Sequence, residues 1–425
     1  TITTNLNNEF KISHCKDENS ILPTSFEIEI ISTKNLGFPF PGLMLFCLNE
    51  NTNEITCVHS GGRRLNSNEK KVKQHFTESN WLAIENQKFT PFFHIFNDSQ
   101  DDALNSKSII EVTINISGKK KDTFTSCVKH NSKPFSSKIY YISDIFSKSI
   151  LEKIKNQDFW IEVSLFSSTF HRMIVGNYDK ELDFHYVTHS FGKIQSKDYI
   201  EPNQLGDTTA FLPLMNALPL NLKVRSYPTN AKGSVKAQVF EYPPSSERRK
   251  SIDSIEFEAR GQSVTCFENN STSLKLYEVK SKCPSRTNAS YNYELKNSRH
   301  PTDIATGFKS RDYPQKISHW GHGVCQKDFI TIIFIRNIQH SKSISKENFS
   351  VPIEIIIFNE DVSFTKKVEI PPSGWNYVEI KPRDFSNSQK NFFSWRFKDF
   401  ESTNMETFWI SYDVKSGAIC GEHGF

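Results

Sequence analysis

Two short stretches decide the fold, Ile110-Glu111-Val112-Thr113-Ile114 and, further along the chain, Ile353-Glu354-Ile355-Ile356-Ile357. In both, every second residue is a bulky apolar one, and successive side chains of a β-strand point to opposite faces. Each stretch is therefore expected to form a strand with one buried face. Similar alternation occurs at 26–30, 222–225, 255–258, 366–370 and 377–380. Strands are thus expected along most of the chain.

The composition of the 425-residue chain also favours strands. It contains 35 Phe, and aromatic residues make up 13% of it. Phe, Ile, Val, Thr and Tyr all favour strands over helices. One helix is expected at 144–155, with Asp144 as its N-cap. The predicted fold class is all-β, with tandem β-sandwich units, mostly antiparallel sheets and very little helix.

Charge and hydropathy exclude several partners. The chain is 24% charged with a net charge of +4, and no basic face with interleaved aromatic residues stands out. We therefore expect no nucleic-acid partner. The mean hydropathy is −0.51, and no apolar run reaches the roughly 18 residues of a membrane span. No membrane span is expected.

An internal repeat organises the chain. Paired landmarks recur in the same order at an offset of about 240 residues: Trp81 and Trp320, Phe89 and Phe329, 110–114 and 353–357, Phe159-Trp160 and Phe408-Trp409, Gly176 and Gly421. Repeats of this kind indicate duplicated structural units. The predicted domains are 1–200, with a Trp-led repeat at about 81–177, and 201–425, with a Trp-led repeat at about 320–421. Each repeat follows an N-terminal layer of strands.

The Trp-led repeats resemble the farnesoic acid O-methyltransferase-type domain. That family places a Tyr-Glu-Ile strand before Phe-Trp-Ile and a closing Val-Gly. In the first repeat the matches are Ile110-Glu111-Val112, Phe159-Trp160-Ile161 and Val175-Gly176. In the second repeat they are Ile353-Glu354-Ile355, Phe408-Trp409-Ile410 and Gly421. The resemblance implies a β-sandwich of invertebrate extracellular proteins, without implying methyl transfer. Both copies lack the family's Gly-Gly-Trp-Gly-Asn stretch.

Glycosylation sequons and cysteines favour export. The chain starts at Thr1 without Met or an apolar leader, as a mature or trimmed product would. Six asparagines lie in Asn-x-Ser/Thr sequons: Asn97, Asn115, Asn269, Asn270, Asn288 and Asn348. Eight cysteines fall into two groups of four, Cys15, Cys47, Cys57 and Cys127, then Cys266, Cys283, Cys325 and Cys420. The expectation is a secreted glycoprotein with disulfides closed within each unit, their connectivity being open.

Signatures of catalysis and of metal binding are missing. The chain has no His-Glu-x-x-His, Gly-x-Ser-x-Gly, Walker or Gly-x-Gly-x-x-Gly motif. Two histidine groups resemble metal ligands, His319, His322 and Cys325 in one and His171, His185 and His189 in the other. A turn with incidental histidines and a solvated strand face are the favoured explanations. We expect a non-enzyme without a cofactor or a metal.

Three tryptophans are the candidate binding residues, namely Trp160, Trp409 and Trp320. In a strand, one member of each Phe-Trp pair faces the core, and core packing is the favoured role of these pairs. The predicted function is extracellular recognition or adhesion through a protein partner. A galectin-like lectin that binds a glycan is the alternative, and a hydrolase with an unrecognised carboxylate pair is a second one. The oligomeric state stays open.

Overall fold

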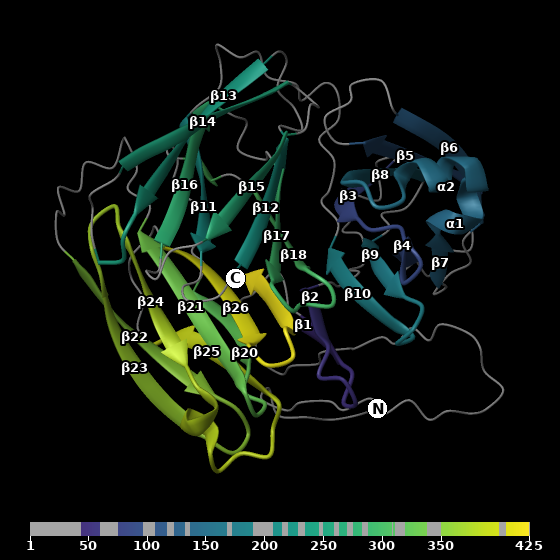
Figure 1. Ribbon diagram of the computed structural model, residues 1–425. Coiled ribbons are helices and arrows are strands. Elements are labelled where there is room, and N and C mark those ends of the chain that lie inside the picture. The colour runs from purple at the N-terminus through teal and green to yellow at the C-terminus, as the bar shows by residue number, and fades with distance from the viewer. Residues whose placement is uncertain are drawn as a thin grey trace. The chain divides into compact units, whose positions relative to one another are not determined.

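The structure is a computed structural model. The described residues are 44–59, 75–96, 107–116, 123–131, 137–167, 172–189, 207–214, 220–227, 234–245, 250–258, 263–269, 275–282, 288–307, 309–310, 319–337, 350–398 and 405–424. For most residues between 207 and 290 this covers the backbone alone. The fold is all-β with antiparallel pairing, which confirms the predicted class (Figure 1).

The first sandwich, residues 75–189, consists of two four-stranded sheets. One has the order β3-β8-β5-β6 and the other the order β10-β9-β4-β7. The strands are β3 (His75–Ala83), β4 (Phe89–Phe96), β5 (Lys107–Ile116), β6 (Thr123–Asn131), β7 (Ser137–Tyr141), β8 (Phe159–Ser167), β9 (Arg172–Asp179) and β10 (Phe184–His189). Alternate residues of both sheets meet in one core, which includes Trp81, Phe93, Val112 and Val175.

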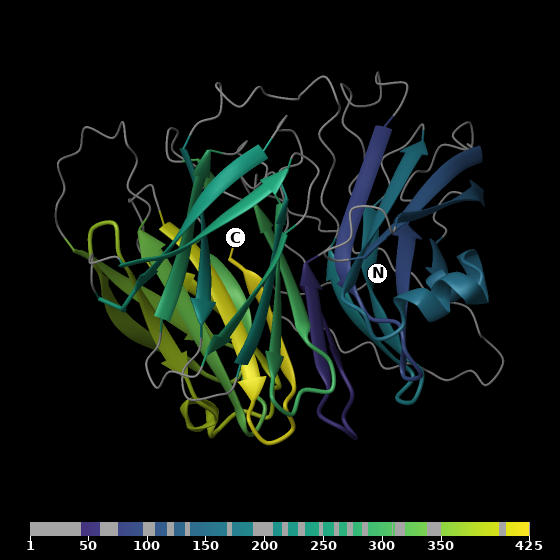
Figure 2. The ribbon, with the colours of Figure 1, turned by 45° about the horizontal axis from the view of Figure 1, so that its top comes forward.

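The predicted helix of the first sandwich is present as two short helices, α1 (Ile142–Ile145) and α2 (Lys148–Ile154), which lie beside its strands in Figure 2. The prediction of one helix capped by Asp144 is wrong. Phe146, between the two helices, has an extended backbone and is buried in the core. Burial of this ring interrupts the helix, and Ser147 takes the N-cap position of α2. Among the described residues, no helix is long and apolar enough to cross a membrane.

The C-terminal sandwich, residues 319–424, also consists of two four-stranded sheets. Their orders are β20-β25-β22-β23 and β24-β21-β26-β27. The strands are β20 (Trp320–Val324), β21 (Phe329–Asn337), β22 (Val351–Phe358), β23 (Ser363–Ile370), β24 (Trp375–Ile380), β25 (Phe392–Phe397), β26 (Met405–Asp413) and β27 (Ile419–His423). A short 3-10 helix, η5 (Pro382–Phe385), precedes β25.

A middle pair of sheets precedes the C-terminal sandwich. Their orders are β14-β13-β16-β11-β19 and β15-β12-β17-β18. The strands are β11 (Asp207–Leu214), β12 (Leu220–Tyr227), β13 (Ser234–Tyr242), β14 (Lys250–Glu258), β15 (Ser263–Asn269), β16 (Lys275–Lys282), β17 (Asn288–Leu295), β18 (Thr302–Gly307) and β19 (Lys309–Ser310). Near the N-terminus, β1 (Met44–Leu48) and β2 (Ile55–His59) form a separate two-stranded sheet.

The chain divides into two compact units. One contains Cys57–Lys193, and the other contains Ile194–Phe425 together with Cys47–Thr56. The first sandwich therefore belongs to one unit, and the middle sheets and the C-terminal sandwich belong to the other. The predicted domain boundary at 200/201 lies outside the described residues.

The internal repeat is confirmed by the topology of the two sandwiches. If β3 to β10 are matched in chain order with β20 to β27, the order β3-β8-β5-β6 becomes β20-β25-β22-β23. The order β10-β9-β4-β7 becomes β27-β26-β21-β24, which is the second C-terminal sheet read from its other edge. The two sandwiches therefore share all of their strand neighbours.

The strand register supports the first half of the predicted alignment. Phe89 lies opposite Asp179 in the first sandwich, and Phe329 lies opposite Asp413 in the C-terminal one. Likewise, Ile114 lies opposite Phe124 on β6, just as Ile357 lies opposite Phe364 on β23. The strand pairs 110–114 and 353–357 are thus equivalent.

The second half of the predicted alignment is wrong. Phe159-Trp160 lies on β8, whereas Phe408-Trp409 lies on β26, which is the counterpart of β9. Gly176 on β9 and Gly421 on β27 are not equivalent either. The true counterpart of β8 is β25, which carries Trp395. Short Phe-Trp motifs recur on different strands because any buried strand can use them.

The pairing of Trp81 with Trp320 is also wrong, by one residue. Trp81 lies opposite Ile161 and faces the core. The equivalent pair in the C-terminal sandwich is Gly321 and Trp395, and a Cβ on Gly321 would lie 2.6 Å from the Trp395 ring. One large and one small residue thus fill this space in both sandwiches, on opposite strands. A shift of one residue reverses the face of a strand side chain.

Candidate functional site

The three candidate tryptophans differ in accessibility. Trp160 is 8% exposed and Trp409 is 0% exposed, so neither indole is available to a partner. Their burial gives no support to the assignment as binding residues, and within the first Phe-Trp pair Phe159 is the member that lies in the sandwich core. Trp320 is half-buried on β20, and it is the one tryptophan of the described residues that is not buried.

Of the two histidine groups, the structure describes every side chain of the first alone, and there His322 and Cys325 contact different residues. His322 lies on β20, where its Nδ1 is 3.1 Å from Ser394 Oγ. The buried Cys325 thiol instead donates to the Lys390 carbonyl oxygen, 3.2 Å away. In the other group, His171 and the side chain of His189 lie outside the described residues.

His185 belongs to an aromatic cluster that the sequence did not reveal. We define the histidine–tyrosine face as Phe92 and His94 of β4, Tyr141 of β7, Tyr178 of β9 and His185 of β10. Core side chains on these strands, such as those of Phe93, Tyr140 and Val175, point into the sandwich. Because strand side chains alternate, the residues of the histidine–tyrosine face point away from that core. Phe92 is buried, with 2% of its surface exposed, and the other four residues are half-buried.

Ring contacts hold this face together. Tyr178 and His185 are cross-strand partners whose ring centroids are 4.6 Å apart. Phe92 meets the His185 ring edge to face at 4.8 Å, although β9 separates their strands. Gly176, the β9 residue opposite Phe92, has no side chain that would keep these rings apart. The result is a layer of rings across three strands.

Hydrogen bonds fix two of the phenol groups. Tyr141 Oη lies 3.2 Å from His185 Nε2, and Tyr178 Oη donates to Asp183 Oδ1 at 2.8 Å. Asp183 sits in the turn between β9 and β10 with a φ of 49°, a conformation that Asp tolerates better than most residues. Asp179 Oδ1 stabilises the same turn by accepting the backbone N–H groups of residues 181 and 182.

Burial keeps the histidines of this face neutral at pH 7. It lowers the pKa of His94 to about 4, with a smaller contribution from His185. The pKa of His185 is also lowered by burial, against the opposing effect of Asp183. Burial and the bond to Asp183 raise the pKa of Tyr178 to about 12. At neutral pH the rings therefore form an uncharged surface with polar edges.

A second surface surrounds Trp320. We define the tryptophan–arginine row as Trp320, Arg396, Ile356 and Thr365, which lie opposite one another across β20, β25, β22 and β23. Their strand neighbours Gly321, Trp395 and Ile357 are buried. The row therefore lies on the outer face of the sheet, where Arg396 and Thr365 are exposed.

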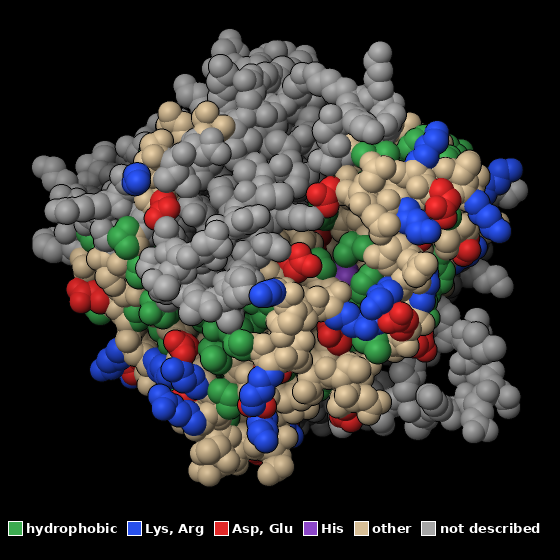
Figure 3. Space-filling view, in the orientation of Figure 1, with side chains coloured by type: hydrophobic (Ala, Val, Ile, Leu, Met, Phe, Trp, Pro, Cys, Tyr) green, Lys and Arg blue, Asp and Glu red, His purple; other side chains and the backbone are tan. Residues whose placement is uncertain are grey.

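Charges of both signs are mixed on the described surface. Figure 3 shows blue and red side chains interspersed over the described parts of the face in view. Together with the net charge of +4, this gives no extended basic patch there of the kind that binds nucleic acid.

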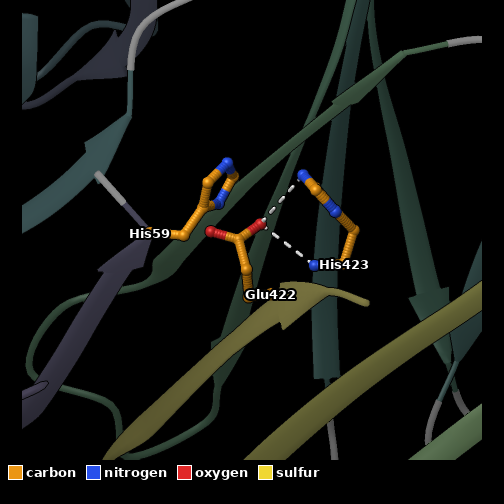
Figure 4. Close-up of side chains that lie close together, drawn as sticks. All are labelled: His59, Glu422 and His423. Carbon is orange, nitrogen blue, oxygen red and sulfur yellow. Dashed lines mark hydrogen bonds and ion pairs between the residues drawn. The ribbon is translucent and has the colours of Figure 1, made fainter. Parts of the chain in front are cut away.

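Glu422 and His423 form a pair at the end of β27. The Glu422 carboxylate accepts the His423 backbone N–H at 3.0 Å, and its Oε1 lies 3.8 Å from His423 Nε2 (Figure 4). His59, which is also drawn in Figure 4, is a residue of the other compact unit. The pair alone offers fewer ligands than the three or four of a protein zinc site.

The described cysteines do not show the predicted disulfides. Cys47, Cys57, Cys127, Cys325 and Cys420 are present as thiols. Cys15 and Cys283 lie outside the described residues, as does the side chain of Cys266. The expected closure of four cysteines within each unit therefore does not occur among the described thiols.

One predicted glycosylation site has a described side chain. Asn115 is half-buried on β5, and its Oδ1 accepts a hydrogen bond from Thr123 at 3.2 Å. Asn97, Asn270 and Asn348 lie outside the described residues, and for Asn269 and Asn288 only the backbone is described. Glycosylation of all six asparagines stays a prediction.

Comparison with known proteins found no family model and no curated protein that match this chain. The resemblance to the farnesoic acid O-methyltransferase-type domain therefore stays a prediction. The sequence pattern indicated His185 and Trp320 but not Tyr141, Tyr178 or Arg396. The alternation of aromatic and histidine side chains over 92–96, on one strand, was the signal that could have located the first surface.

Proposed function

We propose that this protein is a secreted recognition or adhesion protein that binds a protein partner through the histidine–tyrosine face. The observation that carries the proposal is the layer formed by the half-buried rings of Tyr178 and His185, which pack on the buried Phe92 ring. Aromatic residues are enriched at protein interfaces, where they combine a large apolar area with a polar edge. Tyr141 and Tyr178 supply such edges.

The repeat provides a second line of support. In the C-terminal sandwich, the equivalent outer face packs against the middle sheets of the same chain. The Phe408 ring contacts Tyr293 of β17 at a centroid distance of 6.0 Å, and a Cβ on Gly421 would meet Ile304 of β18 at 2.8 Å. This face of the sandwich is therefore one that receives another protein surface elsewhere in the molecule.

Export rests on the sequons. Asn115, on the outer side of its sheet, is the described asparagine that a glycan could reach. The thiols of the described cysteines supply no support for export. Binding rather than catalysis is proposed for the histidine–tyrosine face because its rings are uncharged at neutral pH and pack on one another.

The test is a screen of the purified, labelled chain against an array of extracellular protein domains. A hit should lose at least about tenfold in affinity on Tyr178→Ala, since aromatic hot-spot residues contribute more than about 1–2 kcal/mol. Phe364→Leu on β23 is the control for general effects on the sandwiches and should leave the affinity unchanged.

Two results would contradict the proposal. One is a hit that Tyr178→Ala and His185→Ala both leave intact, which would move binding to another surface. The other is a hit on a glycan array without any on the protein array, which would favour the lectin-like alternative. Retained folding of each variant is checked by its urea midpoint.

A further inference from the structure

We propose a second binding site, the tryptophan–arginine row of the C-terminal sandwich, which takes a short oligosaccharide carrying carboxylate groups. This site goes beyond the proposed protein partner and uses a different sandwich. Trp320 would stack on the apolar face of a sugar ring, and Arg396 would bind a carboxylate.

The residues of the tryptophan–arginine row lie in a line across the sheet. Trp320 lies opposite Arg396, Arg396 lies opposite Ile356, and Ile356 lies opposite Thr365. Neighbouring strands are about 4.8 Å apart, so the row spans roughly 14 Å across the sheet. An elongated ligand could therefore lie across the four strands.

Polar side chains lie beside the row. His322 lies opposite Ser394, and the two side chains are joined at 3.1 Å. The His322 ring contacts the Trp320 ring edge to face at 5.6 Å, which limits the orientations of the indole. The Ser394 hydroxyl lies beside the Trp320 end of the row and the Thr365 hydroxyl lies at its other end, so both ends offer a polar group to the hydroxyls of a sugar.

The row carries a positive charge that is unpaired among the described residues. The Arg396 side chain is exposed, and no ion pair joins it to another described residue. Lys367, on β23, is also exposed. By contrast, Lys398 is paired with Glu354 at 3.1 Å. A guanidinium group binds a carboxylate through two parallel hydrogen bonds, which favours an anionic ligand.

The first sandwich has other residues at the positions of the row. The counterpart of Arg396 in the first sandwich is Glu162, and that of Ile356 is Thr113. The same topology therefore forms with an acid and a small polar residue at these positions. Asn80 takes the position of Trp320 in the same register. Neither the guanidinium nor the half-buried indole is therefore needed to build the sandwich, so a role at the surface explains them.

The probe is tri-galacturonic acid, with maltotriose as the neutral sugar of equal length. Because the other tryptophans are buried, quenching by iodide reports mainly on Trp320. We expect saturable protection from iodide by the acidic sugar and at least about tenfold weaker protection by the neutral one. Calorimetry provides the affinity independently.

Two variants test the residues. Arg396→Glu, at an exposed position, should weaken binding of the acidic sugar at least about tenfold. Trp320→Phe keeps a ring and should weaken binding less than Trp320→Ala. The control Lys129→Glu makes the same charge change on the exposed side of β6 and should have no effect.

The site is overturned by an affinity that survives both Arg396→Glu and Trp320→Ala, or by the lack of saturable binding at millimolar sugar. Preferential binding of a tri-glutamate peptide would also overturn it, in favour of an acidic protein partner. Tyr178→Ala should leave sugar binding unchanged, so failure of the proposed protein interface and failure of this site are separate results.

Discussion

The first and the C-terminal sandwich share their strand order but differ in the faces they turn outward. On the sheet containing β4, the outer residues include His94 and Tyr141. Their counterparts on the sheet containing β21 are Phe334 and Glu379, and the first of these is fully buried. The shared topology constrains the cores, whereas the outer faces are open to change.

The cores themselves show how such a constraint operates. Trp81 and Ile161 form one cross-strand pair, and Gly321 and Trp395 form its counterpart. A large residue is retained at this position although it changes strand. A stable core requires its space to be filled at near-crystalline density, and side chains from either strand can fill it.

The largest expected effect is on stability, when the large side chain of this core position is removed. Trp395→Ala should destabilise the protein by about 3–5 kcal/mol, since it leaves a cavity in the core of the C-terminal sandwich. The double variant Gly321→Trp with Trp395→Ile copies the first sandwich. It should be more stable than the sum of its single variants predicts, by about 1–3 kcal/mol.

Urea unfolding of the two single variants and the double variant measures this coupling. Additive effects would show that the two pairs are not equivalent. Because two compact units are present, the transition of the unit with the C-terminal sandwich is followed separately, by limited proteolysis.

An intermediate effect is expected from pH. Burial lowers the pKa of His94 to about 4, against about 6.5 in an unfolded chain. Between these values the unfolded state binds more protons, so stability should be retained above pH 6.5 and lost as the pH falls toward 4. His94→Phe, which copies Phe334, should reduce this loss.

The measurement is the urea midpoint of wild type and His94→Phe at several pH values from 7 to 4. His319→Phe is the matched control in the other sandwich. An acid-induced loss of the same size in wild type and in His94→Phe would contradict a neutral, buried His94.

The smallest effect concerns thiol reactivity and leaves stability unchanged. Cys127 is exposed on β6, at the position that Lys367 occupies on β23. Burial raises the pKa of the Cys47 thiol to about 11, and the remaining described cysteines are buried. Only Cys127 of these should react rapidly with a thiol reagent in the native protein, because the thiolate is the reactive form.

Counting the thiols before and after unfolding provides the test. Cys127→Ser should remove one rapidly reacting thiol and leave the slow reaction of the other described thiols unchanged. A total in the unfolded, unreduced protein that falls below the number of described thiols would show that disulfides form among these cysteines after all, and would strengthen the case for secretion.

The repeat could be predicted from the sequence only in part. The alternation at 110–114 and 353–357 identified equivalent strands because one-sided burial demands it. A further signal, Phe124-Thr125 with Val128 and Phe364-Thr365 with Val368, would have aligned β6 with β23. The Phe-Trp motifs misled the alignment because they serve cores on non-equivalent strands.

The candidate surfaces were less predictable than the fold. Trp320 was identified, but its partner Arg396 lies far along the chain and meets it only through pairing of β20 with β25. In the same way, Tyr141 and His185 approach across the sheet rather than along the sequence. Local patterns contain no information on such pairs.

By itself, the sequence determined that the chain is built of strands with one apolar face and that its strand pattern occurs twice. Only the tertiary structure decided which strands are equivalent and which aromatic rings face outward. The physical reason is the two-residue period of a strand. If β20 paired with β25 one residue out of register, its residues would still alternate between the two faces, but Trp320 would point inward and Gly321 outward. The pairing with β25, a strand far along the chain, sets the register.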